Sequence, residues 1–331
     1  MNGLSDILVV GEWSNGSLSV TTGELIAAGR QLSNDCSLPV AVAVFGSAPE
    51  SVSQQAIEIG ADKVYLLRSQ YLDDGSSEVQ LGSLEKFCRD IQPTIILFPK
   101  TRFGSELGPR LSFRLNVVLA QDSISMLVEQ GTNRIVVHRP VYGGNAVAKL
   151  RFPPRDPQII ILRSKLYDPI SADSSRHGEV SELEYDIDPD IVKIKRLETV
   201  NRKSEGVSLE EASIIVAGGR GLGGPEPFEQ LQQLADMLGG AVGASRAVCD
   251  AGWLEHSYQI GLTGKTVTPD LYITVGISGA SQHMAGCSGA KDVVAINKDG
   301  DANIFKTASF GVVGDWEKVL PAFIDKIKEL T

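Results

Sequence analysis

Pro39-Val-Ala-Val-Ala-Val-Phe45 opens a stretch that continues through a helical segment at 51–59, stops at Gly60 and resumes with Lys63-Val-Tyr-Leu-Leu67. The first run is apolar at every position, which is typical of a strand buried on both faces of a sheet. Glycine favours the left-handed backbone that ends many helices, so Gly60 marks a helix end. Because two strands joined through a helix lie parallel, this stretch predicts a βαβ unit.

The same alternation of apolar runs and helical stretches covers most of the first half of the chain. It predicts a parallel, doubly wound sheet with helices on both faces. Thr22 is placed to act as the N-cap of the first helix. The further elements expected here are strands at 7–10 and 94–98 and helices at 21–32, 79–91 and 105–115.

The pattern changes after residue 134, where strand-like runs at 134–139, 146–152 and 158–162 follow one another without helices. The pair Gly143-Gly144 supplies a turn between the first two of these runs. These features predict an antiparallel extension of the first sheet. Residues 168–188 are polar and rich in Ser and Asp, which predicts an irregular surface excursion.

A second α/β series fills the rest of the chain, and the polar segment 203–208 is the expected linker to it. The sequence therefore predicts two α/β domains, at 1–204 and 205–331, each built on a mainly parallel, doubly wound sheet. The expected elements of the second domain are strands at 213–217, 272–277, 292–296 and 311–313 and helices at 227–238 and 317–330.

The composition excludes several classes of protein. The net charge of −10 over 331 residues argues against a nucleic-acid binder, which needs a basic surface to neutralise phosphates. No apolar run is long enough to cross a bilayer, so no membrane insertion is expected. A strand pattern begins at Asp6, which leaves no room for a leader and predicts a prokaryote-type cytoplasmic protein. The four cysteines are scattered without a CxxC pair, so a zinc or iron–sulfur site is not expected: Cys36, Cys88, Cys249 and Cys287.

Candidate ligand-binding residues gather in glycine-rich turns of the second half. Gly219, Gly221 and Gly224 satisfy the G-x-G-x-x-G pattern of a dinucleotide-binding turn after an apolar strand. The acidic residue that should bind ribose about 20 positions later is missing, since Ser245 and Arg246 occupy that part of the sequence. The pattern thus leaves two readings open, an NAD site and a tight turn that needs only glycine.

Three further turns carry polar side chains next to small residues, at 242–250, 259–265 and 276–283. In the first, Arg246 is suited to lie over a flat ring or to stabilise an anion, or it is a surface arginine. In the second, Thr263 is bracketed by glycines and either faces a ligand or belongs to a simple loop. The third has the form of a phosphate-binding helix start, with His283 one turn into the helix.

Taken in order, these turns resemble the FAD domain of electron transfer flavoprotein alpha subunits. The resemblance covers most of residues 213–325, and Arg139-Pro-Val-Tyr-Gly-Gly-Asn-Ala146 extends it more loosely to the first half. The motifs that carry it are Gly-Gly-Arg-Gly (218–221), Val-Gly-Ala-Ser-Arg (242–246), Asp-Ala-Gly (250–252), Thr-Gly-Lys (263–265), Pro-Asp-Leu-Tyr-Ile (269–273), Gly-Ile-Ser-Gly-Ala (276–280), Gln-His (282–283), Ala-Gly (285–286), Ala-Ile-Asn-Lys-Asp (295–299) and Ile-Phe (304–305).

The resemblance implies an FAD site in the C-terminal domain, of the kind described as a DHS-like NAD/FAD-binding domain. It implies that Arg246 lies against the isoalloxazine ring, that Thr263 is near the ring atom N5 and that His283 reaches toward the pyrimidine end. It implies that 278–283 hold the diphosphate and ribityl chain. The implied cofactor contacts are Arg220, Ser245, Arg246, Ile260, Gly261, Leu262, Thr263, Ser278, Gly279, Ala280, Ser281, Gln282, His283, Asn297, Asp315 and Trp316, the last three on the adenosine side.

The same resemblance implies a function as an electron carrier rather than an enzyme, which agrees with the lack of a Ser–His–Asp or Cys–His set. The N-terminal domain, similar to adenine nucleotide hydrolases, would hold a beta subunit. The heterodimer would take electrons from dehydrogenases, such as the acyl-CoA dehydrogenases of fatty acid β-oxidation, and pass them to a quinone reductase or another acceptor. An electron-bifurcating, NADH-using flavoprotein, an NAD-dependent enzyme using 218–224 and a non-redox scaffold are the alternatives.

Three positions depart from the family pattern. Leu262 stands where Gln is common, Ser281 where an apolar residue is usual, and Ser309 begins a Ser-Phe pair in place of Asp-Tyr. We expect Leu262 and Ser281 to contribute mainly backbone, so that FAD binding survives and the flavin potential shifts. We expect the departure at Ser309 to affect the adenosine end of the implied FAD site.

Overall fold

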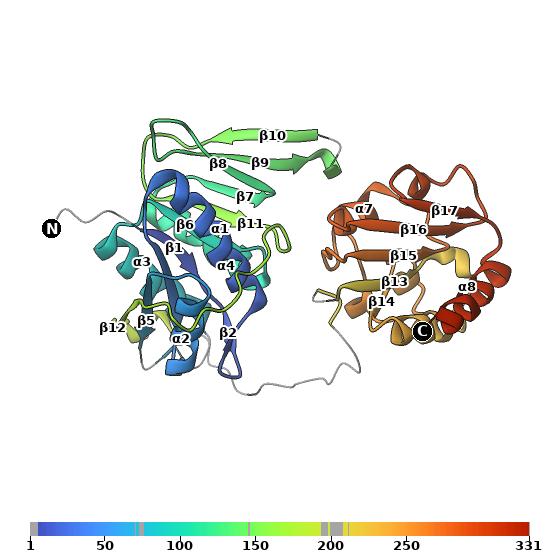
Figure 1. Cartoon of the computed structure of the whole chain (residues 1–331), viewed down its shortest axis with the longest axis horizontal. Helices are drawn as coiled ribbons and strands as arrows, with labels where there is room; N and C mark the ends of the chain where they lie inside the picture. The colour runs from blue at the N-terminus through green and yellow to red at the C-terminus, as the bar shows by residue number, and fades with distance from the viewer. Residues whose placement is uncertain are drawn as a thin grey trace. The chain divides into compact units, whose positions relative to one another are not determined.

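The computed structural model describes residues 6–69, 71–72, 76–144, 146–192, 198, 208–210 and 212–330. The chain divides into two compact units, one formed by 1–141 with 145–200 and the other by 142–144 with 201–331 (Figure 1). The expected domain boundary near 204 and most of the expected linker at 203–208 lie outside the described residues. Among the described residues, no helix combines the length and the apolar character needed to span a bilayer.

The first unit is built on a seven-stranded sheet with the order β12-β5-β4-β1-β6-β11-β7 (Figure 1). Every pair of neighbouring strands is parallel, which confirms the predicted doubly wound sheet. β1 is central because later strands are added on both of its sides. The strands are β1 (Ile7–Val10), β4 (Val40–Phe45), β5 (Lys63–Arg68), β6 (Ile95–Pro99), β7 (Leu119–Ser123), β11 (Gln158–Leu162) and β12 (Glu179–Glu184).

Two apolar cores lie on opposite faces of this sheet. One contains Ile26 of α1 and Val52 of α2, and the other contains Leu84 of α3 and Leu107 of α4. Both faces of β1 and β4 are therefore covered, and every residue of these two strands is buried. The helices are α1 (Val20–Cys36), α2 (Glu50–Glu58), α3 (Ser77–Ile91) and α4 (Arg102–Leu115).

The N-cap of α1 is Ser19 and not Thr22, so this prediction is wrong. The Ser19 hydroxyl accepts a hydrogen bond from Thr22 N at 3.2 Å. The Thr22 hydroxyl instead accepts from Glu12 N at 2.8 Å and donates to Glu12 O at 3.0 Å, on the chain that follows β1. The Thr22 side chain, which the local sequence favours as the cap, is thus engaged in a tertiary contact instead.

The prediction for residues 134–162 is also partly wrong. β9 (Ile135–Val141) and β10 (Ala146–Arg151) form the expected antiparallel pair, but they join β8 (Ser125–Val128) in a separate three-stranded sheet. β11 leaves that pattern and pairs in parallel with β6 and β7. All five residues of β11 are buried, as suits an interior strand of a parallel sheet.

The polar segment 168–188 is only partly irregular, because it contains β12. This strand pairs in parallel with β5 at the edge of the sheet, and its side chains are exposed or half-buried. Charged residues are common on edge strands, where they discourage pairing with other chains. Its polar composition therefore reflects its edge position.

The second unit is built on a five-stranded parallel sheet with the order β14-β13-β15-β16-β17. It is again doubly wound, because β14 follows β13 on one side while β15 and the later strands lie on the other. Its elements are β13 (Ile214–Gly218), α5 (Phe228–Met237), β14 (Ala241–Ala244), α6 (Arg246–Asp250), β15 (Leu271–Val275), α7 (Ser281–Cys287), β16 (Asp292–Asn297), β17 (Phe310–Val313) and α8 (Trp316–Leu330).

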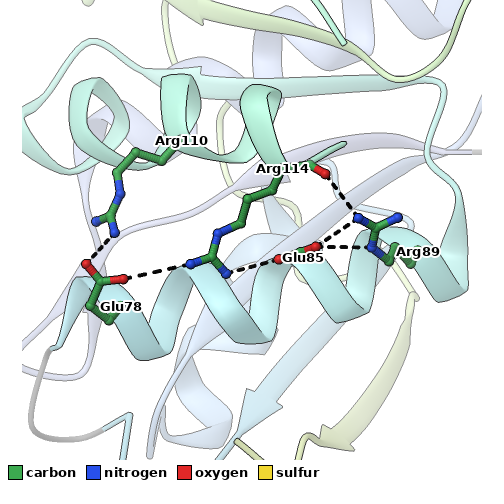
Figure 2. A network of polar contacts seen from close by, with 5 residues as sticks. All are labelled: Glu78, Glu85, Arg89, Arg110 and Arg114. Carbon is green, nitrogen blue, oxygen red and sulfur yellow. Dashed lines mark hydrogen bonds and ion pairs between the residues drawn. The ribbon is translucent and has the colours of Figure 1, made fainter. Parts of the chain in front are cut away.

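A network of ion pairs joins α3 to α4 on the surface of the first unit (Figure 2). Arg114 of α4 lies 3.0 Å from Glu85 and 3.9 Å from Glu78, both on α3. Arg110 pairs with Glu78, and Arg89 pairs with Glu85 at 2.9 Å. Burial would raise the pKa of Glu85, but the guanidinium groups of Arg89 and Arg114 outweigh it and hold that pKa below its usual range.

Arg114→Met is expected to destabilise the first unit only slightly, by about 1 kcal/mol or less, because the paired groups remain partly exposed to water. Urea unfolding in low salt and in 1 M salt would measure this, and the difference should shrink in high salt. Lys326→Met, which removes an exposed pair with Glu329 on α8, is the matched control. A salt-independent loss several times larger would contradict the prediction.

Candidate cofactor site

The site lies at the carboxyl edge of the second sheet, where strand order reverses between β13 and β15. Ligands of open α/β sheets bind at such switch points. The turns that follow the two strands contact each other through their backbones. Gly219 N donates to Val275 O at 2.9 Å, and Gly221 N donates to Gly276 O at 3.1 Å. A Cβ atom at Gly219 would lie 2.2 Å from Gly276 O, so this close approach requires glycine.

A cavity of about 670 Å³ opens at this edge. Its volume falls in the range of roughly 300–1,000 Å³ that is usual for small-molecule sites. It is lined by Arg220, Gly221, Ser245, Arg246, Ala247, Asp250, Gln259, Ile260, Gly261, Leu262, Thr263, Gly276, Ile277, Ser278, Ala280, Gln282, His283, Asn297, Asp299 and Ala302.

Most of the residues expected from the sequence come together in the wall of this cavity, although they belong to several separate turns. Leu262 is 70% exposed at its rim, and its backbone N donates to Gln282 O at 2.7 Å. The expected residues that line the cavity are Arg220, Ser245, Arg246, Ile260, Gly261, Leu262, Thr263, Ser278, Ala280, Gln282, His283 and Asn297.

Four expected residues do not line the cavity. Gly279 has a φ of +77° and packs closely against the chain at Ile304, where a Cβ would lie 2.2 Å from Ile304 N. Ser281 is an exposed residue at the start of α7. Asp315 Oδ1 accepts from Glu317 N at 3.2 Å at the start of α8, and Trp316 packs partly buried against the apolar core. Contact of these four with a cofactor stays a prediction.

The structure adds lining residues that were not among the expected cofactor contacts. Asp250 lies one helical turn after Arg246 on α6, and its Oδ2 is 3.2 Å from Arg246 Nε. The spacing of four residues on a helix was the signal that could have found this pair. The other added residues are Gly221, Ala247, Gln259, Gly276, Ile277, Asp299 and Ala302.

His283 is 7% exposed and is held by two hydrogen bonds. Its Nδ1 lies 3.0 Å from Ile260 O, and its Nε2 lies 2.8 Å from the hydroxyl of Tyr272. A carbonyl only accepts, so Nδ1 carries the proton and Nε2 accepts from Tyr272. Burial lowers the pKa of His283 to about 4, against which the bond to Ile260 acts weakly. The imidazole is therefore neutral, and the side-chain cations of the wall are Arg220 and Arg246.

The chemistry of this wall fits FAD. The two guanidinium groups suit an anionic diphosphate and a ring that gains negative charge on reduction. The glycine turns bring backbone close to the cavity, and Ser245, Thr263 and Ser278 add hydroxyl groups. In the part of the chain that the structure describes, no cluster of three or more His, Cys, Asp or Glu side chains could hold a metal ion.

Comparison with known proteins identifies the same domain. The family pattern of the electron transfer flavoprotein FAD-binding domain matches residues 208–288, and that of the electron transfer flavoprotein domain matches 7–188. The chain is 41% identical to an electron transfer flavoprotein subunit alpha of Bacillus subtilis, over 98% of both chains.

Two other relatives match over nearly the whole chain. An electron transfer flavoprotein subunit alpha of Thermoanaerobacterium thermosaccharolyticum is 39% identical over 100% of both chains. A protein named FixB of Clostridium saccharobutylicum is 36% identical over 98% of this chain and 96% of its own. The chain therefore belongs to the electron transfer flavoprotein alpha subunit family, whose members carry FAD and transfer electrons.

Proposed function

We propose that this chain binds one FAD in the cavity at the carboxyl edge of the second sheet and works as the alpha subunit of a heterodimer with a beta subunit. The observation that carries the proposal is the convergence of Arg220, Arg246, Thr263 and Ser278 from four separate turns on one cavity. That cavity lies largely within the segment that matches the family's FAD-binding domain. The cytoplasmic heterodimer accepts electrons from dehydrogenases, such as those of fatty acid β-oxidation, and delivers them to a quinone reductase or another acceptor.

The two domains have different roles in this proposal. The N-terminal domain, up to about residue 204, is the scaffold for the beta subunit, and the C-terminal domain carries FAD. Electrons enter and leave during transient docking with partner proteins. An NAD-dependent enzyme is disfavoured, because β14 ends at Ala244 and is followed by Ser245 and Arg246 rather than by a ribose-binding acid.

Bound FAD supplies the redox chemistry, and the chain supplies its binding and its electrostatic environment. The side chain of Arg246 is 66% exposed, and its guanidinium carries positive charge at the cavity wall. The neutral His283 fixes the position of Ile260 O by donating to it. The hydroxyl groups of Thr263 and Ser278 offer hydrogen bonds to the cofactor. We also propose the remaining expected contacts, including Gly279, Ser281, Asp315 and Trp316.

Isolation of the complex from its host tests the proposal. We expect a yellow heterodimer that releases one FAD on denaturation. A colourless preparation that retains no FAD on reconstitution would overturn the proposed function. Two FAD molecules together with reduction by NADH would replace it with the electron-bifurcating alternative.

Arg246→Met is expected to lower the reduction potential of bound FAD by on the order of 60 mV for one electron, which corresponds to about 1.4 kcal/mol. The reason is loss of the positive charge that favours the reduced, more negative ring. Asp250→Asn is the matched variant, because it removes the carboxylate that pairs with Arg246, and it should raise the potential. Spectroelectrochemical titration measures both. Shifts of the same sign in the two variants would contradict the assignment.

A further inference from the structure

Gln259 occupies a fixed position in the cavity wall, between the end of β14 and the turn that carries Thr263. It is 4% exposed, and its backbone is tied on both sides: its N donates to His256 O at 3.1 Å, and its O accepts from Lys265 N at 2.7 Å. The next residue, Ile260, donates from N to Ala244 O at 2.9 Å. These hydrogen bonds therefore fix the backbone position from which the Gln259 side chain extends.

The Gln259 amide links two other side chains. Its Oε1 lies 3.1 Å from His256 Nδ1, and its Nε2 donates to Thr263 Oγ1 at 3.0 Å. An amide oxygen only accepts, so His256 Nδ1 carries a proton and donates it to the amide. The amide nitrogen then faces Thr263 as a donor. Hydrogen-bond direction thus runs from His256 through Gln259 to Thr263.

This direction determines what the Thr263 hydroxyl can offer. A hydroxyl has one proton, and the oxygen of Thr263 already accepts from Gln259. Within the described residues, no acceptor in the protein takes the Thr263 proton. Thr263 lines the cavity, so its proton is available to a bound ligand.

We infer that Gln259 is a positioning residue that makes the Thr263 hydroxyl a hydrogen-bond donor toward the flavin. The inference rests on the proposed function, because it needs a flavin ring near Thr263. Hydrogen bonds to ring nitrogens tune flavin electronics. A ring nitrogen that is unprotonated in oxidised flavin accepts from a hydroxyl, whereas the same nitrogen carries a proton after full reduction. A hydroxyl held as a donor therefore favours the oxidised ring.

A double-mutant cycle in the full heterodimer tests this inference. Gln259→Met keeps the side-chain length but removes both amide hydrogen bonds, and Thr263→Val removes the hydroxyl but keeps its shape. Loss of one hydrogen bond corresponds to a few-fold change in affinity. We expect Gln259→Met to weaken binding of oxidised FAD about three- to tenfold when Thr263 is present, and by no more than about twofold in the Thr263→Val background.

Two further variants separate positioning from simple packing. Thr263→Ser keeps the hydroxyl and should keep the coupling with Gln259. Gln259→Glu can only accept while ionised, so it draws the Thr263 proton away from the cavity and reverses the direction of the bond. Because its added charge acts in both backgrounds, comparison with and without Thr263→Val removes the charge effect. Should Gln259→Met fail to fold, His256→Ala at the exposed end of the link frees the amide to turn and gives the same test.

The readouts are the FAD dissociation constant, the midpoint potential and the resonance Raman stretch of the flavin carbon–nitrogen bonds, which reports hydrogen bonding to the ring. Coupled effects that vanish with Thr263→Val support the inference. Equal effects of Gln259→Met in both backgrounds would overturn it and leave Gln259 as a packing residue. A wild-type heterodimer that binds no FAD would instead show that the proposed function has failed.

Discussion

Gly219→Ala should destabilise the second unit by about 3 kcal/mol and remove most of the bound FAD from the purified complex. A Cβ atom at this position would lie 2.2 Å from Gly276 O and 2.7 Å from Ile277 Cα. Both are backbone atoms, so no side-chain rotation relieves the overlap. The φ of Gly219 is −110°, which any residue adopts. The loss of stability therefore comes from pushing the two turns apart and not from strain in a dihedral angle.

Chemical unfolding of the heterodimer and its ratio of FAD absorbance to protein would measure this loss. Gly300→Ala is a matched control in the same unit, since the nearest neighbour of its Cβ would be a Val313 methyl group at an ordinary 3.5 Å. That variant should change stability by less than about 0.5 kcal/mol. Full FAD content and unchanged stability in Gly219→Ala would show that the two turns are not in close contact.

A fall in pH from 6.5 to about 4 should cost the second unit about 3 kcal/mol of stability through His283 alone. In the folded chain, burial holds the pKa of this imidazole near 4, while in the unfolded chain it titrates near 6.5. Between these values the unfolded chain binds the extra proton. The contribution is therefore fully present above pH 6.5 and is lost as the pH falls through this window.

His283→Gln removes the titrating group and should flatten the pH dependence of the unfolding free energy in this range. His177→Gln, at an exposed position of the first unit, is the control for a substitution of the same type. Urea titrations at several pH values between 4 and 7 provide the measurement. Equal slopes for the wild-type chain and His283→Gln would mean that the imidazole is protonated in the folded protein.

The parallel sheets were predictable because buried strands of such sheets are apolar at every position, as in β1 and β4. Strand partners were less predictable. The run that became β11 follows an antiparallel pair in the sequence, and only long-range pairing with β6 places it in the large sheet. β14 was missed because its residues, Ala-Val-Gly-Ala, carry little of the β-branched signal that marks a strand.

The cavity, too, was only partly predictable from the sequence. Its glycine turns were visible as patterns, since a turn is a local property of sequence. The link from Gln259 to Thr263 depends on where the two side chains meet in space. The charge state of His283 depends on its burial, and its tautomer depends on its hydrogen bond to Tyr272, which lies on a different element. No local pattern contains those facts.

The contact between the turns after β13 and β15 also divides the substitutions that this protein can accept during evolution into two kinds. Backbone atoms of these two turns contact each other and set the shape of the cavity floor, by which we mean this pair of turns. Most substitutions elsewhere therefore leave the floor in place. The side chains around the rim, such as Leu262 with its backbone N bound to Gln282 O, can be exchanged without moving that floor. Descendants of this chain can therefore drift in redox potential while they keep the same cofactor, and a designer can vary the rim with little risk to the fold.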